Sequence, residues 1–149
     1  MSVTHDTFVL ERIYDASLER VFAAWSDPKA KAQWFVGPDD WEQSDYDLDF
    51  RVGGREHISG GAPGGPDYSY DATIQDIVPN ERIIHSYEMQ LDGKRISVSV
   101  ATIEFSSAGD GTRLVLTEQG AYLDGLDDPR QREQGTSEFL DALKRHLER

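Results

Sequence analysis

The last stretch of the chain, residues 128–149, constrains the fold most, because it predicts one long helix that is apolar along only half of its length. Asp128 can cap its start, Pro129 suits its first position, and such a helix extends about 30 Å. The apolar stripe lies in the second half and consists of Phe139, Leu140, Leu143 and Leu147. The same face in the first half carries Thr136, Gly135, Arg132 and Gln131. None of these four fills a core, so the pattern predicts a helix that covers a cavity at its N-terminal end.

The rest of the chain predicts one strand, two short helices and a run of further strands. The first strand is expected over residues 7–14. Ser17 caps a helix whose apolar face repeats at i, i+3, i+4 and i+7, and Pro28 starts a second, shorter helix. Alternating apolar and polar residues then predict strands near 46–50, 55–58, 68–74, 82–90, 96–105 and 113–120. The glycine- and proline-rich residues 60–66 predict a loop, and Asp92-Gly93 predicts a tight hairpin.

This order of elements predicts an α+β fold with an antiparallel sheet of about seven strands. Consecutive strands joined by short turns form an antiparallel sheet, and one face of that sheet has to be covered. The terminal helix is the only predicted element long enough to cover it. We therefore expect a curved sheet wrapped around the C-terminal helix, with the two short helices closing one end and a space left between sheet and helix.

Length, charge and composition narrow the classes of function. The 149 residues predict one domain over 1–149. The net charge of −13 disfavours nucleic acid and anionic membrane surfaces as partners. The absence of cysteine excludes disulfides, thiolate metal sites and cysteine nucleophiles. The sequence shows no signal peptide, no apolar run of membrane-spanning length and no phosphate-binding glycine loop. We expect a cytoplasmic protein without a cofactor.

Several segments in a fixed order resemble one known superfamily. The matching segments are 11–16 (ERIYDA), 21–28 (VFAAWSDP), 34–35 (WF), 50–54 (FRVGG), 76–83 (DIVPNERI) and 111–117 (GTRLVLT). They resemble the START and birch-pollen-allergen-like superfamily (SRPBCC), in its bacterial branch similar to the ATPase-activator domain of a large heat-shock chaperone. The branch usually has Gly-Trp early in its last helix, whereas Thr136 follows Gly135 here. If that ring normally fills space, this chain has a wider or wetter cavity.

The resemblance implies a helix-grip fold with a cavity for lipophilic or aromatic molecules, and it leaves the function open among three classes. The first is binding of a small apolar or aromatic ligand. The second is a chaperone-regulating interaction module with a role in the stress response. The third is a cyclase- or lyase-type enzyme acting on an aromatic or polyketide-like substrate. A chaperone partner and a homodimer both stay open.

The expected site lies between the sheet and the first half of the terminal helix. Its expected lining is Trp34, Phe35, Tyr46, Leu48, Tyr70, Tyr87, Met89, Val98, Val100, Leu116, Arg132, Gly135 and Phe139. The aromatic members could equally be core residues. Glu118 shares strand parity with Leu114 and Leu116, so it is a candidate for proton transfer that Arg132 could partner. The alternative is that the parity drifts near Gly120 and Glu118 is solvated.

His85 is the other catalytic candidate, and no metal site is expected. His85 shares parity with Ile83, Tyr87 and Met89, so it could face the cavity as an acid–base group; the alternative, which we prefer, is a histidine that faces solvent or a satisfied partner. Asp45, Asp47, Asp49 and Glu56 stand at ligand positions of an EF-hand loop. Phe50, however, stands where that loop needs glycine, so we interpret the aspartates as the solvated face of a strand.

Overall fold

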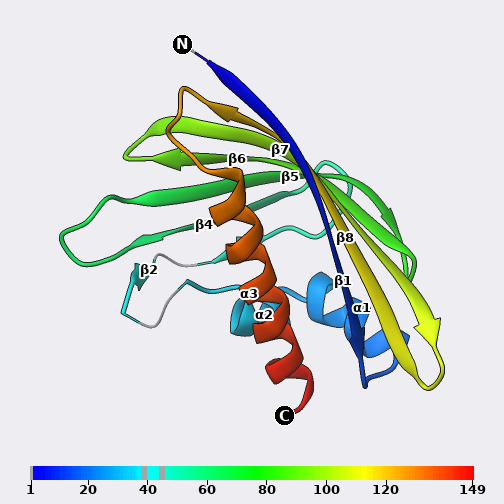
Figure 1. The fold of residues 1–149 in the computed structure, drawn as a ribbon. Coiled ribbons are helices and arrows are strands. Elements are labelled where there is room, and N and C mark those ends of the chain that lie inside the picture. Colours follow the sequence, from blue (N-terminus) through cyan, green and yellow to red (C-terminus); the bar gives the residue numbers. More distant parts are fainter. Residues whose placement is uncertain (1, 38–39, 44–45) are drawn as a thin grey trace.

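The computed structural model describes residues 2–37, 40–43 and 46–149. Asp45 and Pro38 lie outside the described residues. The chain runs through one strand, two short helices, seven further strands and a long helix (Figure 1). These elements are β1 (Val3–Tyr14), α1 (Leu18–Ser26), α2 (Pro28–Trp34), β2 (Glu42–Gln43), β3 (Asp47–Leu48), β4 (Arg55–Gly61), β5 (Tyr68–Val78), β6 (Arg82–Leu91), β7 (Lys94–Ala108), β8 (Gly111–Leu123) and α3 (Pro129–Leu147). The predicted order of elements is confirmed.

All strands of the described residues belong to one antiparallel sheet, in the order β1-β8-β7-β6-β5-β4-β2, with β3 also paired to β4. Every long strand from β4 to β8 pairs with the next one along the chain, and β8 then pairs with β1. The sheet curves, and α3 lies across its concave face with α1 and α2 beside it (Figure 1). This arrangement is the predicted helix-grip fold. None of the helices in the described part of the chain is both long and apolar enough to cross a membrane.

Local sequence signals account for the ends of the helices. The side chain of Ser17 accepts a hydrogen bond from the backbone of Arg20 and caps α1. Asp27 caps α2 and Asp128 caps α3 in the same way, each followed by a proline in the first helical turn. These caps satisfy backbone N–H groups that have no partner inside the helix.

The structure corrects the predicted strand over 46–50. Only Asp47–Leu48 pairs as a strand there, because the backbone turns immediately afterwards, with hydrogen bonds from Arg51 to Asp49 and from Gly54 to Arg51. The expected loop over 60–66 is shorter than predicted, since β4 continues to Gly61. The predicted hairpin at Asp92-Gly93 is present, and both of its residues have positive φ, as a two-residue hairpin turn requires.

The core lies between α1, α2, the second half of α3 and the adjoining strands. Val21, Ile103 and Leu114 are completely buried there, and Tyr14 donates a hydrogen bond from its hydroxyl to the backbone carbonyl of Leu140 at 3.0 Å. This bond fixes α3 to β1, at one edge of the sheet. The core therefore holds the C-terminal half of α3 firmly in place.

Candidate functional site

The first half of α3 is much less buried than the second half. The buried residues of α3 are Leu140, Leu143 and Leu147, all in its C-terminal half. A Cβ atom built on Gly135 would meet no atom of a neighbouring element within 4 Å among the described residues. One turn later the ring of Phe139 packs on Phe35, with centroids 4.7 Å apart. The Gly135 position therefore has open space around it, in the half of the helix where the sequence predicts a cavity.

Arg132, one turn before Gly135, forms a buried polar cluster with the sheet. Its Nη1 donates to the Tyr87 hydroxyl at 3.1 Å, and its Nη2 donates to Ser97 Oγ at 2.9 Å. Arg132 also forms an ion pair with Asp127. The Tyr87 hydroxyl donates in turn to Glu118 Oε1 at 2.8 Å. We call these five residues the Glu118 cluster, and it joins β6, β7, β8 and the start of α3.

Glu118 points inward, as its spacing from Leu114 and Leu116 predicts, and it is only 3% exposed. Burial raises the pKa of its carboxyl, and this effect exceeds the lowering by the Arg132 charge and the Tyr87 hydrogen bond. The geometry explains why Arg132 compensates so little. Its Nη1 lies 3.8 Å from Glu118 Oε2, too far for a hydrogen bond, and its Nη2 is taken by Asp127 and Ser97.

A second buried polar cluster, the Glu56 cluster, lies on the side of β4 and α2. Glu56 Oε2 accepts hydrogen bonds from Lys31 Nζ at 2.5 Å and from the Tyr46 hydroxyl, and its Oε1 accepts from the Tyr70 hydroxyl at 2.9 Å. Lys31 and Glu56 are 4% and 3% exposed. Burial alone would raise the pKa of Glu56, but the Lys31 charge and the hydrogen bonds hold it below its usual range.

His85 lies next to the Glu56 cluster and is buried. Burial lowers its pKa to about 4, and the neighbouring Lys31 charge acts in the same direction, so the imidazole is neutral at pH 7. His85, Lys31 and Glu56 all border a small cavity of about 10 Å³, which is room for about one water molecule. A neutral, buried imidazole with such a low pKa is a weak proton acceptor, so its placement favours a structural role.

Aromatic rings connect the two polar clusters. The rings of Tyr70 and Tyr87 have centroids 4.8 Å apart, and Tyr70 also contacts Phe35 at 5.3 Å. Further toward the rim of the sheet, Trp41 stacks on Tyr68 with an interplanar angle of 10°. Tyr70 of the Glu56 cluster and Tyr87 of the Glu118 cluster thus bring the two polar clusters together on the sheet.

Most residues predicted to line the site face the interior, but they differ in how deeply they are buried. Trp34, Tyr70, Tyr87 and Leu116 are buried. Phe35, Tyr46, Leu48, Met89, Arg132, Gly135 and Phe139 are half-buried. Trp34 packs within the short helices, where its Nε1 donates to the Ala24 carbonyl and its ring contacts Trp25. Its surroundings are those of a core residue.

The placement of Val98 and Val100 in the cavity was wrong. Their exposed fractions are 43% and 40%, and they lie on the outer face of β7. The reason is a β-bulge: Met89 pairs with Ser97 and Gln90 pairs with Arg95, so Ile96 is an extra residue in β7. The bulge buries both Ile96 and Ser97 and reverses the alternation that follows. Ser97 and Ser99 face inward instead of the valines.

Sequence reasoning also missed Lys31, Asp127 and Tyr122, whose ring centroid lies 5.5 Å from the Arg132 guanidinium. It considered Glu56 only as a calcium ligand. Two signals could have found the buried ion pair. Lys31 stands three residues before the buried Trp34 on the same face of α2, and Glu56 shares strand parity with Ile58. A lysine and a glutamate that both occupy inward positions have to pair, because either charge alone is too costly to bury.

The two described aspartates of the EF-hand-like pattern, Asp47 and Asp49, do not form a site with Glu56. Asp47 and Asp49 are exposed, Asp49 pairs with Arg51 at 2.8 Å, and Glu56 points inward to Lys31. The described residues contain no cluster of His, Asp and Glu that could hold a metal ion.

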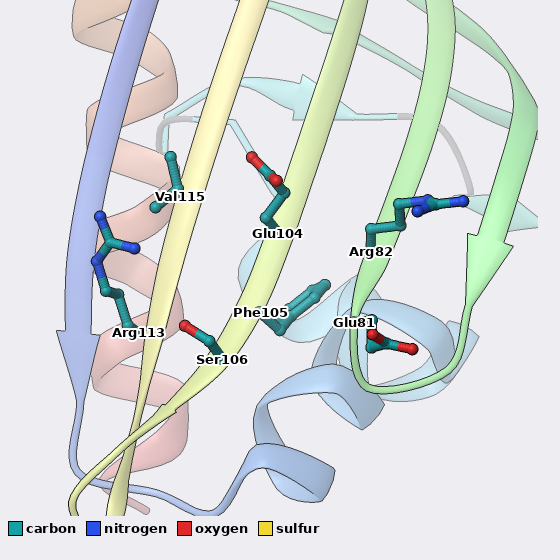
Figure 2. A pocket seen from close by; sticks show the side chains of 7 residues that line it. All are labelled: Glu81, Arg82, Glu104, Phe105, Ser106, Arg113 and Val115. Carbon is teal, nitrogen blue, oxygen red and sulfur yellow. The ribbon is translucent and has the colours of Figure 1, made fainter.

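A separate depression of about 290 Å³ lies on the other side of the sheet, over β6, β7 and β8 (Figure 2). Its lining consists of Glu81, Arg82, Glu104, Phe105, Ser106, Arg113 and Val115. Both arginines of this lining already form ion pairs, Arg82 with Asp76 at 2.5 Å and Arg113 with Glu11 at 2.7 Å. This outer groove is a mixed-charge surface, unlike the aromatic concave face.

Comparisons with known proteins agree with this architecture. An uncharacterized protein from Rhizobium leguminosarum is 48% identical, with a TM-score of 0.94 over 99% of this chain and 97% of that chain. The Mll3558 protein from Rhizobium loti is 44% identical, with a TM-score of 0.91 over 99% of this chain and 100% of that chain. The AHSA1-like protein from Aeromonas hydrophila is 25% identical, with a TM-score of 0.71 over 96% and 92%. No curated protein matches the sequence.

One family model matches nearly the whole chain. Its description is "Activator of Hsp90 ATPase homolog 1-like protein", and it covers residues 15–148. The resemblance seen in the sequence is thereby confirmed, and the chain belongs to the family of Activator of Hsp90 ATPase homolog 1-like proteins.

Proposed function

We propose that residues 1–149 act as one ligand-binding domain that takes a small, neutral aromatic molecule between the first half of α3 and the sheet. The observation that carries the proposal is the free space at Gly135, where a Cβ would touch no neighbouring element. Alanine would fit at position 135 without a clash and would favour the helix by about 1 kcal/mol over glycine. We infer that glycine is kept there because it leaves room for a ligand.

The residues around that space suit an aromatic ligand. Tyr70, Tyr87 and Phe35 form an aromatic group, and the half-buried Met89 adds a thioether that adapts to different shapes. Binding sites for small molecules are typically apolar, with a few fixed polar groups at one side. The Glu118 cluster supplies such groups. The net charge of −13 favours a neutral ligand over an anionic one.

The neutral naphthalene dye prodan, whose fluorescence reports polarity, tests the proposal. Wild-type protein should bind the dye and shift its emission to the blue. Gly135→Phe should nearly abolish binding, because the new ring fills the space. Gln134→Phe is the matched control, since it places the same ring at an exposed position of the same helix. Failure of the wild type to bind the dye, or unchanged binding by Gly135→Phe, would refute the proposal.

The family description favours a second candidate, a module that regulates a heat-shock chaperone. The outer groove would be the docking surface, because it is exposed and bears both charge signs. Adding the protein to a purified Hsp90-type chaperone should then raise the ATPase rate, and Arg82→Glu with Arg113→Glu should remove the increase. An ATPase rate unchanged by a saturating amount of the protein would rule this candidate out.

A further inference from the structure

Three buried oxygen atoms near the Glu118 cluster have no hydrogen-bond partner among the described residues. They are Glu118 Oε2, Ser99 Oγ and Tyr122 OH. Buried polar groups are nearly always hydrogen-bonded, and leaving one unpaired is costly. Glu118, Ser99 and Tyr122 are each at most 3% exposed, so bulk water cannot serve them. Three unpaired oxygens in one region call for a common partner.

The strand register brings these three residues together. Gly120 pairs with Ser99, and Glu118 and Tyr122 flank Gly120 at the neighbouring inward positions of β8. The point where a Cβ of Gly120 would stand lies 3.0 Å from Ser99 Oγ and 3.0 Å from Tyr122 Cζ, the carbon that carries the hydroxyl. Because Gly120 has no side chain, the Tyr122 ring and the Ser99 hydroxyl both lean into its place.

All three groups can donate a hydrogen bond as well as accept one. A hydroxyl does both, and burial raises the pKa of Tyr122 to about 12, so its hydroxyl stays protonated at pH 7. Burial also raises the pKa of Glu118, so this carboxyl keeps its proton, and its capacity to donate, to a higher pH than a solvated glutamate does. The positive charge of Arg132 is balanced by the ion pair with Asp127. The surroundings therefore suit a neutral oxygen better than an ion of either sign.

We propose that Glu118, Ser99 and Tyr122 form a subsite for one neutral oxygen of the ligand, a phenol hydroxyl or a ketone carbonyl. This inference rests on the proposed function, since the ring that carries the oxygen would occupy the space beside Gly135. Arg132 lies three residues before Gly135, on the preceding turn of α3, and bonds to Tyr87 of the Glu118 cluster, so the two parts of the site adjoin. The ligand class is thus an aromatic ring system with a neutral oxygen substituent.

Two probes of the same size separate the ring from the oxygen: 2-naphthol and 2-methylnaphthalene, whose methyl group replaces the hydroxyl. Calorimetric titration should show wild-type protein binding 2-naphthol about tenfold more tightly. Ser99→Ala and Tyr122→Phe should each reduce that preference several-fold while leaving the affinity for 2-methylnaphthalene unchanged. Ser107→Ala, which removes an exposed hydroxyl from the same strand, should change neither affinity.

The outcomes distinguish this inference from the proposed function. Equal binding of both probes by the wild type, or a full preference for 2-naphthol in both variants, would overturn the oxygen subsite alone. The three oxygens would then share a buried water. Failure of both probes to bind would overturn the proposed function and the subsite together. Both variants remove only an unpaired oxygen, so we expect folded protein, and Ser99→Ala suffices if Tyr122→Phe does not fold.

Discussion

The interior of this protein contains two acidic side chains in opposite electrostatic situations. Glu56 accepts three hydrogen bonds and faces a lysine at 2.5 Å, so it stays ionised. Glu118 accepts one hydrogen bond, and its nearest cation lies 3.8 Å away and is engaged by Asp127. The first carboxylate ties α2 and the residues around Tyr46 to the sheet. The second keeps a free oxygen beside the proposed ligand site.

Removing the lysine of the buried pair should destabilise the protein strongly. Lys31→Met leaves the Glu56 charge buried without its cation, and such changes cost about 3–5 kcal/mol. Urea denaturation measures the effect. Lys29→Met, at an exposed position of the same helix, should change the free energy of unfolding by less than about 0.5 kcal/mol. The double variant Lys31→Met/Glu56→Gln should regain part of the free energy of unfolding that Lys31→Met loses. If Lys31→Met and Lys29→Met changed the free energy of unfolding equally, the buried ion pair would contribute little to stability.

The raised pKa of Glu118 predicts a definite pH dependence. Above the unfolded-state pKa of 4.5, the folded protein still holds a proton that the unfolded chain has lost. The contribution of Glu118 to stability is therefore fully present below pH 4.5 and is lost as the pH rises through the raised folded-state pKa. Glu118→Gln keeps an acceptor for Tyr87 but cannot ionise.

Urea denaturation of wild type and Glu118→Gln across this pH range checks the sign. The free energy of unfolding of the wild type, minus that of Glu118→Gln, should fall as the pH rises above 4.5. Contributions from other groups, including Glu56, cancel in this difference. A difference that grows with pH would mean that Arg132 stabilises an ionised Glu118.

Residue patterns predicted part of the site and failed at one irregularity. The inward position of Glu118 and its proximity to Arg132 follow from strand parity and helix periodicity. Ser97 and Ser99 could not be predicted, because the bulge at Ile96 reverses the alternation and nothing in the local sequence marks it. Such a bulge depends on pairing with β6, which is a tertiary property. The same slip misplaced Val98 and Val100.

At the scale of elements, α3 combines a fixed half and a free half. Leu140, Leu143 and Leu147 are buried, and the Tyr14 hydroxyl bonds to the backbone of the same region. The first half is held by the polar contacts of Arg132 and by the bond from Arg12 Nη2 to Ser137 Oγ at 2.7 Å. The uneven apolar stripe in the sequence predicted this division correctly. A ligand can replace polar contacts such as these more readily than it can displace the side chains of a packed core.

Gly135→Ala should stabilise the unliganded protein. The new methyl group meets no neighbouring element within 4 Å, and alanine favours helix over glycine by about 1 kcal/mol. Thermal unfolding should show a modest rise in Tm. A loss of stability of about 1–3 kcal/mol, typical of an overpacked site, would mean instead that the helix packs closely on the sheet at Gly135. The free space on which the proposed function rests would then be absent.

At the scale of the whole molecule, the sheet has two faces with different chemistry. The concave face carries buried aromatic rings and the two polar clusters, and α3 covers it (Figure 1). The outer face carries exposed valines and the charged groove over β6–β8 (Figure 2). The fold class followed from the order of strands and helices in the sequence. The choice between these two faces as the functional one depends on side-chain contacts that only the folded chain shows.

Binding of a small aromatic molecule on the concave face beside Gly135 can be located residue by residue. The measurement is a titration of isotope-labelled protein with 2-methylnaphthalene, followed by NMR. We predict saturable changes in the backbone signals of Tyr87, Met89, Arg132 and Gly135, with the signals of Glu104 and Arg113 unchanged. Changes confined to the outer groove, or no saturable change at all, would contradict the account.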